Sequence, residues 1–144
     1  MFERILVVCT GNICRSPVGE ALLKQHLPGR QIASAGLGAM VGQGVEPTAK
    51  RLGETDGLSL DTHQARQLTL DMLGQADLVL VMSDSQRRAV GDLLPAALGK
   101  TMLFGRWLGS KGAEIPDPYR KSEEVFRHVH KQLSLAAQAW SQKL

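Results

Sequence analysis

Hydrophobic and polar positions along the chain fall into two alternating patterns. Short, mostly apolar runs are typical of buried parallel strands, and four segments fit this pattern: residues 4–8, 31–35, 77–82 and 101–104. Between and after them lie stretches with helical spacing or helix-start signals, over residues 17–27, 47–55, 69–75, 83–94 and from Ser122 onward. This alternation predicts one α/β domain over residues 1–144, with a four-stranded parallel sheet flanked by helices on both faces (flavodoxin-like or Rossmann-like).

Helix starts in this pattern carry capping signals. Ser16 is expected at the N-cap of the first helix, Pro17 at its first position and Glu20 in its first turn. Ser122 is expected to cap the last helix, whose apolar stripe is predicted from helical spacing. That stripe comprises Val125, Val129, Leu133, Ala136 and Trp140.

Composition adds limits to this picture. The chain has 144 residues, of which 43% are hydrophobic, and a formal charge of +3 with no long run of Lys or Arg. These features fit one hydrophobic core and disfavour a nucleic-acid or membrane-surface patch. The chain enters a strand at once, without a signal-peptide pattern, and no apolar run is long enough to span a membrane. Two cysteines do not make a disulfide framework, so we expect a cytoplasmic protein.

The candidate chemistry lies in residues 9–16, between the first strand and the first helix. A strand that passes through a glycine-containing loop into a helix N-terminus directs backbone N–H groups at an anion, and the helix dipole adds positive character. Here Cys9 opens the loop and Arg15 stands near its end. The Cys-x5-Arg spacing alone is a weak signal, because a cysteine at a strand end is often only a small buried hydrophobe.

Four motifs together carry a resemblance to a known family. They are Cys9-Thr10-Gly11-Asn12-Ile13-Cys14-Arg15-Ser16-Pro17, Ser34-Ala35-Gly36, His63-Gln64-Ala65-Arg66 and Asp117-Pro118-Tyr119-Arg120. Over nearly the whole chain, the sequence resembles the low-molecular-weight protein tyrosine phosphatases. The Asp-Pro-Tyr-Arg motif and residues 36–42 resemble the bacterial branch that acts on tyrosine autokinases linked to exopolysaccharide or capsule production.

The resemblance implies hydrolysis of phosphotyrosine through a cysteinyl-phosphate. Cys9 would be the nucleophile, Arg15 would hold the phosphoryl oxygens as a planar fork, and Asp117 would be the general acid and base. Ser16 would hydrogen-bond the Cys9 sulfur and ease its departure. A phosphotyrosine protein, expected to be a bacterial tyrosine autokinase, would be the partner, and no metal or other cofactor is expected.

The resemblance also implies supporting and substrate-binding residues. Asn12 would adopt a left-handed conformation, which Asn tolerates better than most residues. Ser34, Ser16 and His63 would brace it, with His63 held charged by Glu20 and Asp84. Residues expected to contact substrate are Gly11, Asn12, Ile13, Cys14, Leu37, Met40 and Tyr119.

Several alternatives remain open on the sequence. Cys14 is either a packed thiol or the partner of Cys9 in a reversible, protective disulfide. The rival functions are an arsenate reductase of related fold, which would need further cysteines, and an inactive phosphotyrosine-binding module, which would not need intact Cys9, Arg15 and Asp117. An ATP-binding P-loop is excluded, because no Gly-Lys-Ser/Thr follows the glycine.

Overall fold

The computed structural model describes residues 2–144 and places the predicted strands and helices within about two residues of their expected ends. One element was not predicted: a 3₁₀ helix, η1, begins at Pro95, where the sequence indicated only the end of a helix. The elements, in chain order, are β1 Arg4–Cys9, α1 Arg15–His26, β2 Gln31–Gly36, α2 Pro47–Thr55, α3 Leu70–Gln75, β3 Leu78–Val81, α4 Asp84–Leu93, η1 Pro95–Lys100, β4 Thr101–Leu103 and α5 Glu123–Lys143.

The four strands form one parallel sheet in the order β2-β1-β3-β4, which confirms the predicted fold class. The chain moves outward from β1 to β2 and then returns to add β3 on the other side of β1. The connections that leave β1 and β3 therefore diverge at their carboxyl ends, where open α/β sheets bind ligands. The Cys9–Ser16 loop begins at that end of β1.

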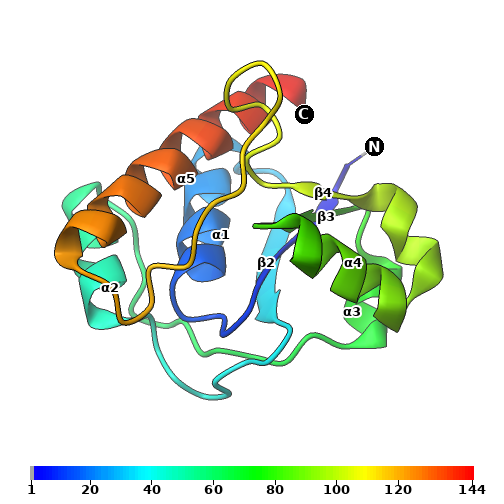
Figure 1. The fold of residues 1–144 in the computed structure, drawn as a ribbon, viewed down its shortest axis with the longest axis horizontal. Helices are drawn as coiled ribbons and strands as arrows, with labels where there is room; N and C mark the ends of the chain where they lie inside the picture. The colour runs from blue at the N-terminus through cyan, green and yellow to red at the C-terminus, as the bar shows by residue number, and fades with distance from the viewer. Residues whose placement is uncertain (1) are drawn as a thin grey trace.

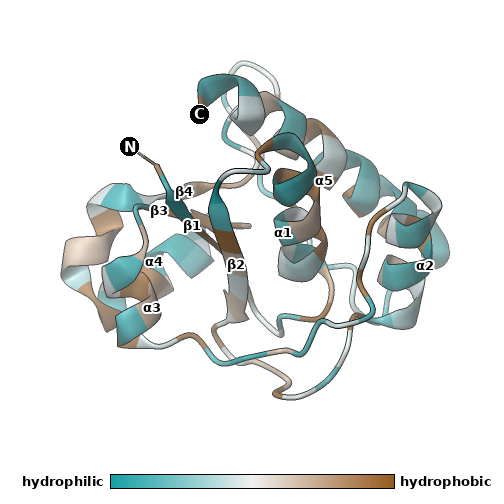
Figure 2. Ribbon diagram, turned by 180° about the vertical axis from the view of Figure 1, so that it is seen from behind, coloured by the Kyte–Doolittle hydropathy of each residue, from teal (hydrophilic) through white to brown (hydrophobic). Residues whose placement is uncertain are grey.

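Helices cover both faces of the sheet, with α1, α2 and α5 on one side and α3 and α4 on the other (Figure 1). The side chains of β1 alternate between the two layers. Ile5 and Val7 pack in the core beneath α1 and α5, whereas Leu6 and Val8 pack in the core beneath α3 and α4. Because both faces are covered, β1 reads as an unbroken apolar run rather than an alternating one. Figure 2 shows the hydrophobic strands enclosed by helices with mixed surfaces.

The start of α1 differs from the prediction. Arg15 is its first residue, Cys14 occupies the N-cap position without a side-chain cap, and the first turn contains no acidic residue. Ser16 therefore does not cap the helix. Its hydroxyl instead forms hydrogen bonds with the side chains of Cys9 and Asn12. These partners within the buried loop replace the backbone amide that a helix cap would bind.

The last helix follows its predicted start but not its whole predicted face. Ser122 accepts a hydrogen bond from the Val125 amide, as expected of the N-cap. Val125 itself is only partly buried, however, and Phe126 takes the inner position. Trp140 donates from its indole nitrogen to the Phe104 carbonyl over 2.8 Å, which fixes α5 to the segment that follows β4. Of the helices within residues 2–144, none is both long and apolar enough to cross a membrane.

Candidate active site

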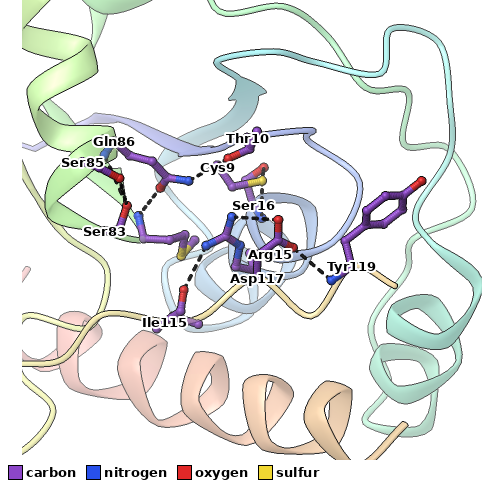
Figure 3. A network of polar contacts seen from close by, with 11 residues as sticks. Cys9, Thr10, Arg15, Ser16, Ser83, Ser85, Gln86, Ile115, Asp117 and Tyr119 are labelled. Carbon is purple, nitrogen blue, oxygen red and sulfur yellow. Dashed lines mark hydrogen bonds and ion pairs between the residues drawn. The ribbon is translucent and has the colours of Figure 1, made fainter. Parts of the chain in front are cut away.

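The Cys9–Ser16 loop borders a cavity of about 170 Å³. Two later segments complete its wall: the connection after β2 and the connection before α5. Figure 3 shows Cys9, Arg15 and Asp117 close together at the end of the sheet. The cavity is lined by Cys9, Thr10, Gly11, Ile13, Cys14, Arg15, Gly38, Met40, Asp117 and Tyr119.

Cys9 ends β1 and is almost fully buried. Its Sγ lies 2.9 Å from the Ser16 hydroxyl, and the Ser16 backbone N–H donates to the same sulfur over 3.4 Å. Both groups belong to the first turn of α1, where unpaired N–H groups and the helix dipole favour negative charge. The sulfur therefore stands in surroundings that stabilise an anion.

Arg15 is a buried cation that lines the cavity. Its Nη1 donates to the Ile115 carbonyl over 2.9 Å, and its Nη2 lies 3.6 Å from the Asp117 carboxylate. Its Nε is buried and has no hydrogen-bond partner within residues 2–144. A buried charged donor without a partner is costly, and an oxygen of a bound anion would satisfy it. The guanidinium is thus fixed at one corner, and its Nε N–H is left without a partner.

Asp117 belongs to the connection between β4 and α5 and is about half exposed. One carboxylate oxygen accepts from the Tyr119 amide over 3.0 Å, while the other faces Arg15. Pro116 and Pro118 flank it and restrict the backbone on both sides. The segment is also held from behind, because the Ile115 amide donates to the Met82 carbonyl just past β3.

Asn12 shapes the middle of the loop. It is fully buried, and its φ of 59° lies in the left-handed region, as predicted. Its side-chain nitrogen donates to the hydroxyls of Ser16 and Ser34, over 2.7 and 3.0 Å, and its side-chain oxygen accepts from the Arg66 amide. The Asn12 carbonyl lies 2.7 Å from His63 Nε2. The structure therefore places the predicted bracing residues Ser16, Ser34 and His63 around Asn12.

The two carboxylates predicted to hold His63 make no direct hydrogen bond or ion pair with it within residues 2–144. Glu20 accepts from Lys24 and Ser34, and within residues 2–144 neither Glu20 nor Asp84 bonds or pairs with His63. Asp84 follows β3, on the side of β1 away from β2, whereas His63 shares a separate cavity with Ser34 of β2. That second cavity, about 370 Å³, lies behind the loop and also includes Glu20.

The predicted apolar wall is placed in part. Ile13, Met40 and Tyr119 line the cavity, but Leu37 does not. The Leu37 side chain packs instead against the core beneath α3 and α4. Only its backbone serves the loop, through an amide that donates to the Cys9 carbonyl over 2.9 Å.

Cys14 also lines the cavity, as a free and buried thiol. Burial is the main cause that raises the pKa of Cys14 to about 12, and negative charge on Asp117, Cys9 and Glu46 adds to it. Cys9 is also a free thiol in this structure, and a disulfide between the two stays a prediction.

Thr10 and Gly38 also line the cavity, and the sequence indicated them only as members of the Cys9–Pro17 motif and of residues 36–42. Gln86 of α4, which bonds Thr10, was not predicted. The signal for Gln86 was present, because Ser83-x-x-Gln86 matches the pattern of a helix capping box. Within residues 2–144, no three or more His, Cys, Asp and Glu side chains are grouped so as to hold a metal ion.

The fold and the site define an α/β protein that carries a buried thiol in an anion-binding loop, with a buried guanidinium and a carboxylate across the cavity. Comparison with known proteins gives the family. Residues 4–144 match the family model described as low molecular weight phosphotyrosine protein phosphatase. The chain belongs to this family, as its motifs predicted.

Three relatives illustrate how close the similarity is. The low molecular weight protein-tyrosine-phosphatase Etp of Escherichia coli K12 is 48% identical over 99% of this chain and 95% of its own length. The crystal structure of the tyrosine phosphatase AmsI of Erwinia amylovora is 51% identical, with a TM-score of 0.96 over 100% of this chain and 94% of its own. Vibrio vulnificus Wzb in complex with benzylphosphonate is 44% identical, with a TM-score of 0.95 and full coverage of both chains. These relatives are bacterial, as the predicted branch requires.

Proposed function

We propose that this protein is a protein-tyrosine-phosphatase that hydrolyses phosphotyrosine through a covalent intermediate on Cys9. The observation that carries the proposal is that one cavity holds three groups with complementary chemistry: the Cys9 thiol, the Arg15 guanidinium and the Asp117 carboxylate. Ester cleavage of a phosphate needs a nucleophile, stabilisation of the equatorial oxygens and an acid for the leaving group.

In the first step, the Cys9 sulfur attacks phosphorus as a thiolate, and the bond from phosphorus to the tyrosine oxygen breaks. Arg15 binds two of the three equatorial oxygens in bidentate fashion, and its unpaired Nε is available for one of them. The loop N–H groups and the α1 dipole stabilise the remaining negative charge on the phosphoryl oxygens. Asp117 gives its proton to the departing phenolate, so tyrosine leaves as a neutral phenol.

In the second step, water attacks the cysteinyl-phosphate in line with the sulfur. Asp117, now ionised, accepts a proton from that water, and the sulfur leaves as a thiolate. The Ser16 hydroxyl, 2.9 Å from Sγ, donates to the departing sulfur and lowers its basicity. Inorganic phosphate is released, and Asp117 is again protonated.

The apolar wall supports an aromatic phosphomonoester as substrate. Ile13, Met40 and Tyr119 line the same cavity as the Cys9 thiol and the Arg15 guanidinium. A phenyl ring fills such a slot and brings its phosphate to the bottom, whereas the shorter phosphoserine leaves the wall uncovered. The complex of a relative with benzylphosphonate, an aromatic phosphonate, supports the same substrate class.

The partner we propose is a phosphotyrosine protein of the bacterial cytoplasm, namely a tyrosine autokinase that controls exopolysaccharide or capsule production. Support comes from the family, from bacterial relatives that are similar over nearly the whole chain, and from the apolar residues that line the cavity. A phosphatase acting on the kinase would return its phosphotyrosines to tyrosines.

The test compares wild type and Cys9→Ser on p-nitrophenyl phosphate, a phosphotyrosine peptide and a phosphoserine peptide. We expect wild type to hydrolyse the first two at least about a hundredfold faster than the third, and Cys9→Ser to lose turnover while it still binds inorganic phosphate. Rapid quenching of wild type should trap one phosphoryl group on Cys9, detected by mass spectrometry of its peptide. Turnover by Cys9→Ser like that of wild type contradicts the mechanism.

Two further arms separate the rival functions. Reduction of arsenate coupled to thioredoxin identifies an arsenate reductase, and binding of the phosphotyrosine peptide without turnover identifies an inactive binding module. We expect neither result from the wild-type protein.

A further inference from the structure

Gln86 is a buried polar residue that the catalytic steps above do not use. It lies in the first turn of α4 and is 6% exposed. Its side-chain Oε1 accepts from the Met82 amide over 2.8 Å, and its Nε2 lies 3.1 Å from the Thr10 hydroxyl (Figure 3). Because a backbone N–H can only donate, the oxygen of the Gln86 amide must face Met82, and its NH₂ group must face Thr10.

The helix start explains why this side chain reaches both partners. Ser83 caps α4 and accepts from the Gln86 amide over 3.2 Å, as in a Ser-x-x-Gln capping box. In that box, the glutamine side chain returns to the amide of the cap residue itself. Here it returns one residue further, to Met82, just beyond β3. One end of the amide thus fixes the turn from β3 into α4, and the other end is free to hold the Cys9–Ser16 loop.

The turn at Met82 also supports the segment that carries the acid. The Met82 carbonyl accepts from the Ile115 amide over 2.9 Å, and the Ile115 carbonyl accepts from Arg15 over 2.9 Å. A series of hydrogen bonds therefore links Thr10 to Gln86, Gln86 to Met82, Met82 to Ile115, and Ile115 to Arg15. The series begins and ends on the same loop, and Ile115 lies two residues before Asp117.

Thr10 is confined on its backbone side as well. Its carbonyl accepts from the Gly38 amide over 3.0 Å, and a Cβ added at Gly36 would stand only 2.5 Å from that carbonyl oxygen. The main chain of Thr10 is thus set by the connection after β2, and its hydroxyl is set by Gln86 from the side of β3. Gln86 therefore ties the start of the loop to the turn that follows β3.

We propose that Gln86 is a positioning residue for phosphate binding and transfer. Its amide holds Thr10, and with it the first residues after Cys9, at a fixed distance from the β3 terminus that supports the acid segment. The proposal deepens the proposed function and rests on it. Glutamine suits the position because it accepts from Met82 and donates to Thr10 at once. A glutamate has no donor, and an apolar side chain has neither group.

Two single variants and their combination test the link. Gln86→Met removes both hydrogen bonds with little change in volume, whereas Thr10→Val removes only the hydroxyl and leaves the bond from Gln86 to Met82 intact. We expect each to weaken the binding of inorganic phosphate and to lower kcat/KM for p-nitrophenyl phosphate about tenfold, because small displacements of reacting groups are costly. The double variant should be at most about twofold worse than the poorer single variant, because both break the same contact.

Rescue by Thr10→Ser provides the matched control. Serine keeps the hydroxyl, so we expect Thr10→Ser to recover most of the phosphate affinity and kcat/KM that Thr10→Val loses. If Gln86→Met lowers only the free energy of unfolding and leaves phosphate affinity and kcat/KM at wild-type values, the residue has a purely structural role. Additive losses in the double variant also overturn the proposal.

The same set separates this proposal from the proposed function. Phosphate binding by calorimetry needs no turnover, so the positioning role can be measured even if the protein hydrolyses no phosphotyrosine. Should Gln86→Met fail to fold, Thr10→Val against Thr10→Ser still decides the question, because both leave the Gln86 bond at the start of α4 in place.

Discussion

The Nη2 of Arg15 lies 3.6 Å from the Oδ2 of Asp117, and the Arg15 side chain is buried whereas the Asp117 side chain is half exposed. The same guanidinium donates to the carbonyl of Ile115, two residues before the acid. The group that would bind the phosphoryl oxygens therefore also holds the backbone of the acid-bearing segment. Phosphate binding and placement of the acid depend on one side chain.

Replacement of Arg15 by lysine should accordingly affect more than charge. Lysine keeps the positive charge but cannot bind two oxygens as a fork while it also holds the Ile115 carbonyl. We expect kcat/KM for p-nitrophenyl phosphate to fall at least about a hundredfold in Arg15→Lys. The matched control is Arg127→Lys on the exposed face of α5, which should behave as wild type. Equal activity of Arg15→Lys and wild type would show that the fork is not needed.

Substrates with different leaving groups can distinguish a role of Asp117 as an acid from a role in binding. Asp117→Asn cannot donate a proton, so kcat should fall about a hundredfold or more on a phosphotyrosine peptide. The loss should be smaller on p-nitrophenyl phosphate, because nitrophenolate leaves readily without protonation. Steady-state kinetics on both substrates check this. An equal loss on the two substrates argues that Asp117 acts through structure rather than as an acid.

The left-handed conformation of Asn12 makes a prediction about stability. Asn12→Ala loses the bonds to Ser16, Ser34 and the Arg66 amide, and an L-residue other than Asn or Asp is strained at a φ of 59°. We expect the free energy of unfolding to fall by about 3 kcal/mol. Asn12→Gly loses the same bonds without the strain and should retain about 1 kcal/mol more. Urea denaturation of both variants measures the difference, and equal values would mean that the backbone conformation carries no cost.

Gly36 ends β2 where the Cys9–Ser16 loop comes closest. A Cβ there would stand 2.5 Å from the Thr10 carbonyl oxygen and 3.1 Å from the Asn12 amide nitrogen, so Gly36→Ala must displace the loop. We expect phosphate affinity and kcat/KM to fall at least about tenfold. Gly74→Ala in α3 is the control, because nothing lies within 4 Å of the added methyl group. Wild-type kinetics in Gly36→Ala would show that the loop can shift without loss.

The buried Cys14 thiol should make the free energy of unfolding depend on pH, and the sign of this dependence follows from the surroundings of the thiol. Burial raises its pKa to about 12, above the value of about 8.5 expected in the unfolded chain, so the folded protein favours the neutral thiol. The stability from this preference is complete below about pH 8.5 and is lost as the pH rises toward 12. Urea denaturation from pH 8 to pH 10.5 should therefore show a steeper fall for wild type than for Cys14→Ser. Parallel curves for the two proteins contradict the assignment.

Local features of this chain were readable from its sequence because their causes are local. Mostly apolar runs predicted all four strands, and the cap at Ser122 predicted the start of α5, since strand burial and helix capping depend on near neighbours. The left-handed backbone of Asn12, by contrast, was implied by the family resemblance and not by a local pattern.

Where the structure differs from the predictions, long-range partners had prevailed. Ser16 resembles a helix cap but gives its hydroxyl to Cys9 and Asn12, and Leu37 resembles a substrate wall but packs on the far face of the sheet. Glu20 bonds Ser34 instead of His63. In each case, several partners compete for one side chain, and only the packed structure shows which one lies within reach.

By itself, then, the sequence determined the order of strands and helices and the presence of an anion-binding loop with a thiol and a guanidinium. Which distant residues meet there depends on the tertiary structure, and before it only the family resemblance indicated Asp117, Ser34 and His63. The sheet order β2-β1-β3-β4 brings the segment after β4 across the end of β3, where the Met82 carbonyl holds Ile115 and so carries Asp117 to Arg15. Strand order and the pairing of buried polar groups are properties of the whole fold, so no periodicity along the chain could specify that meeting.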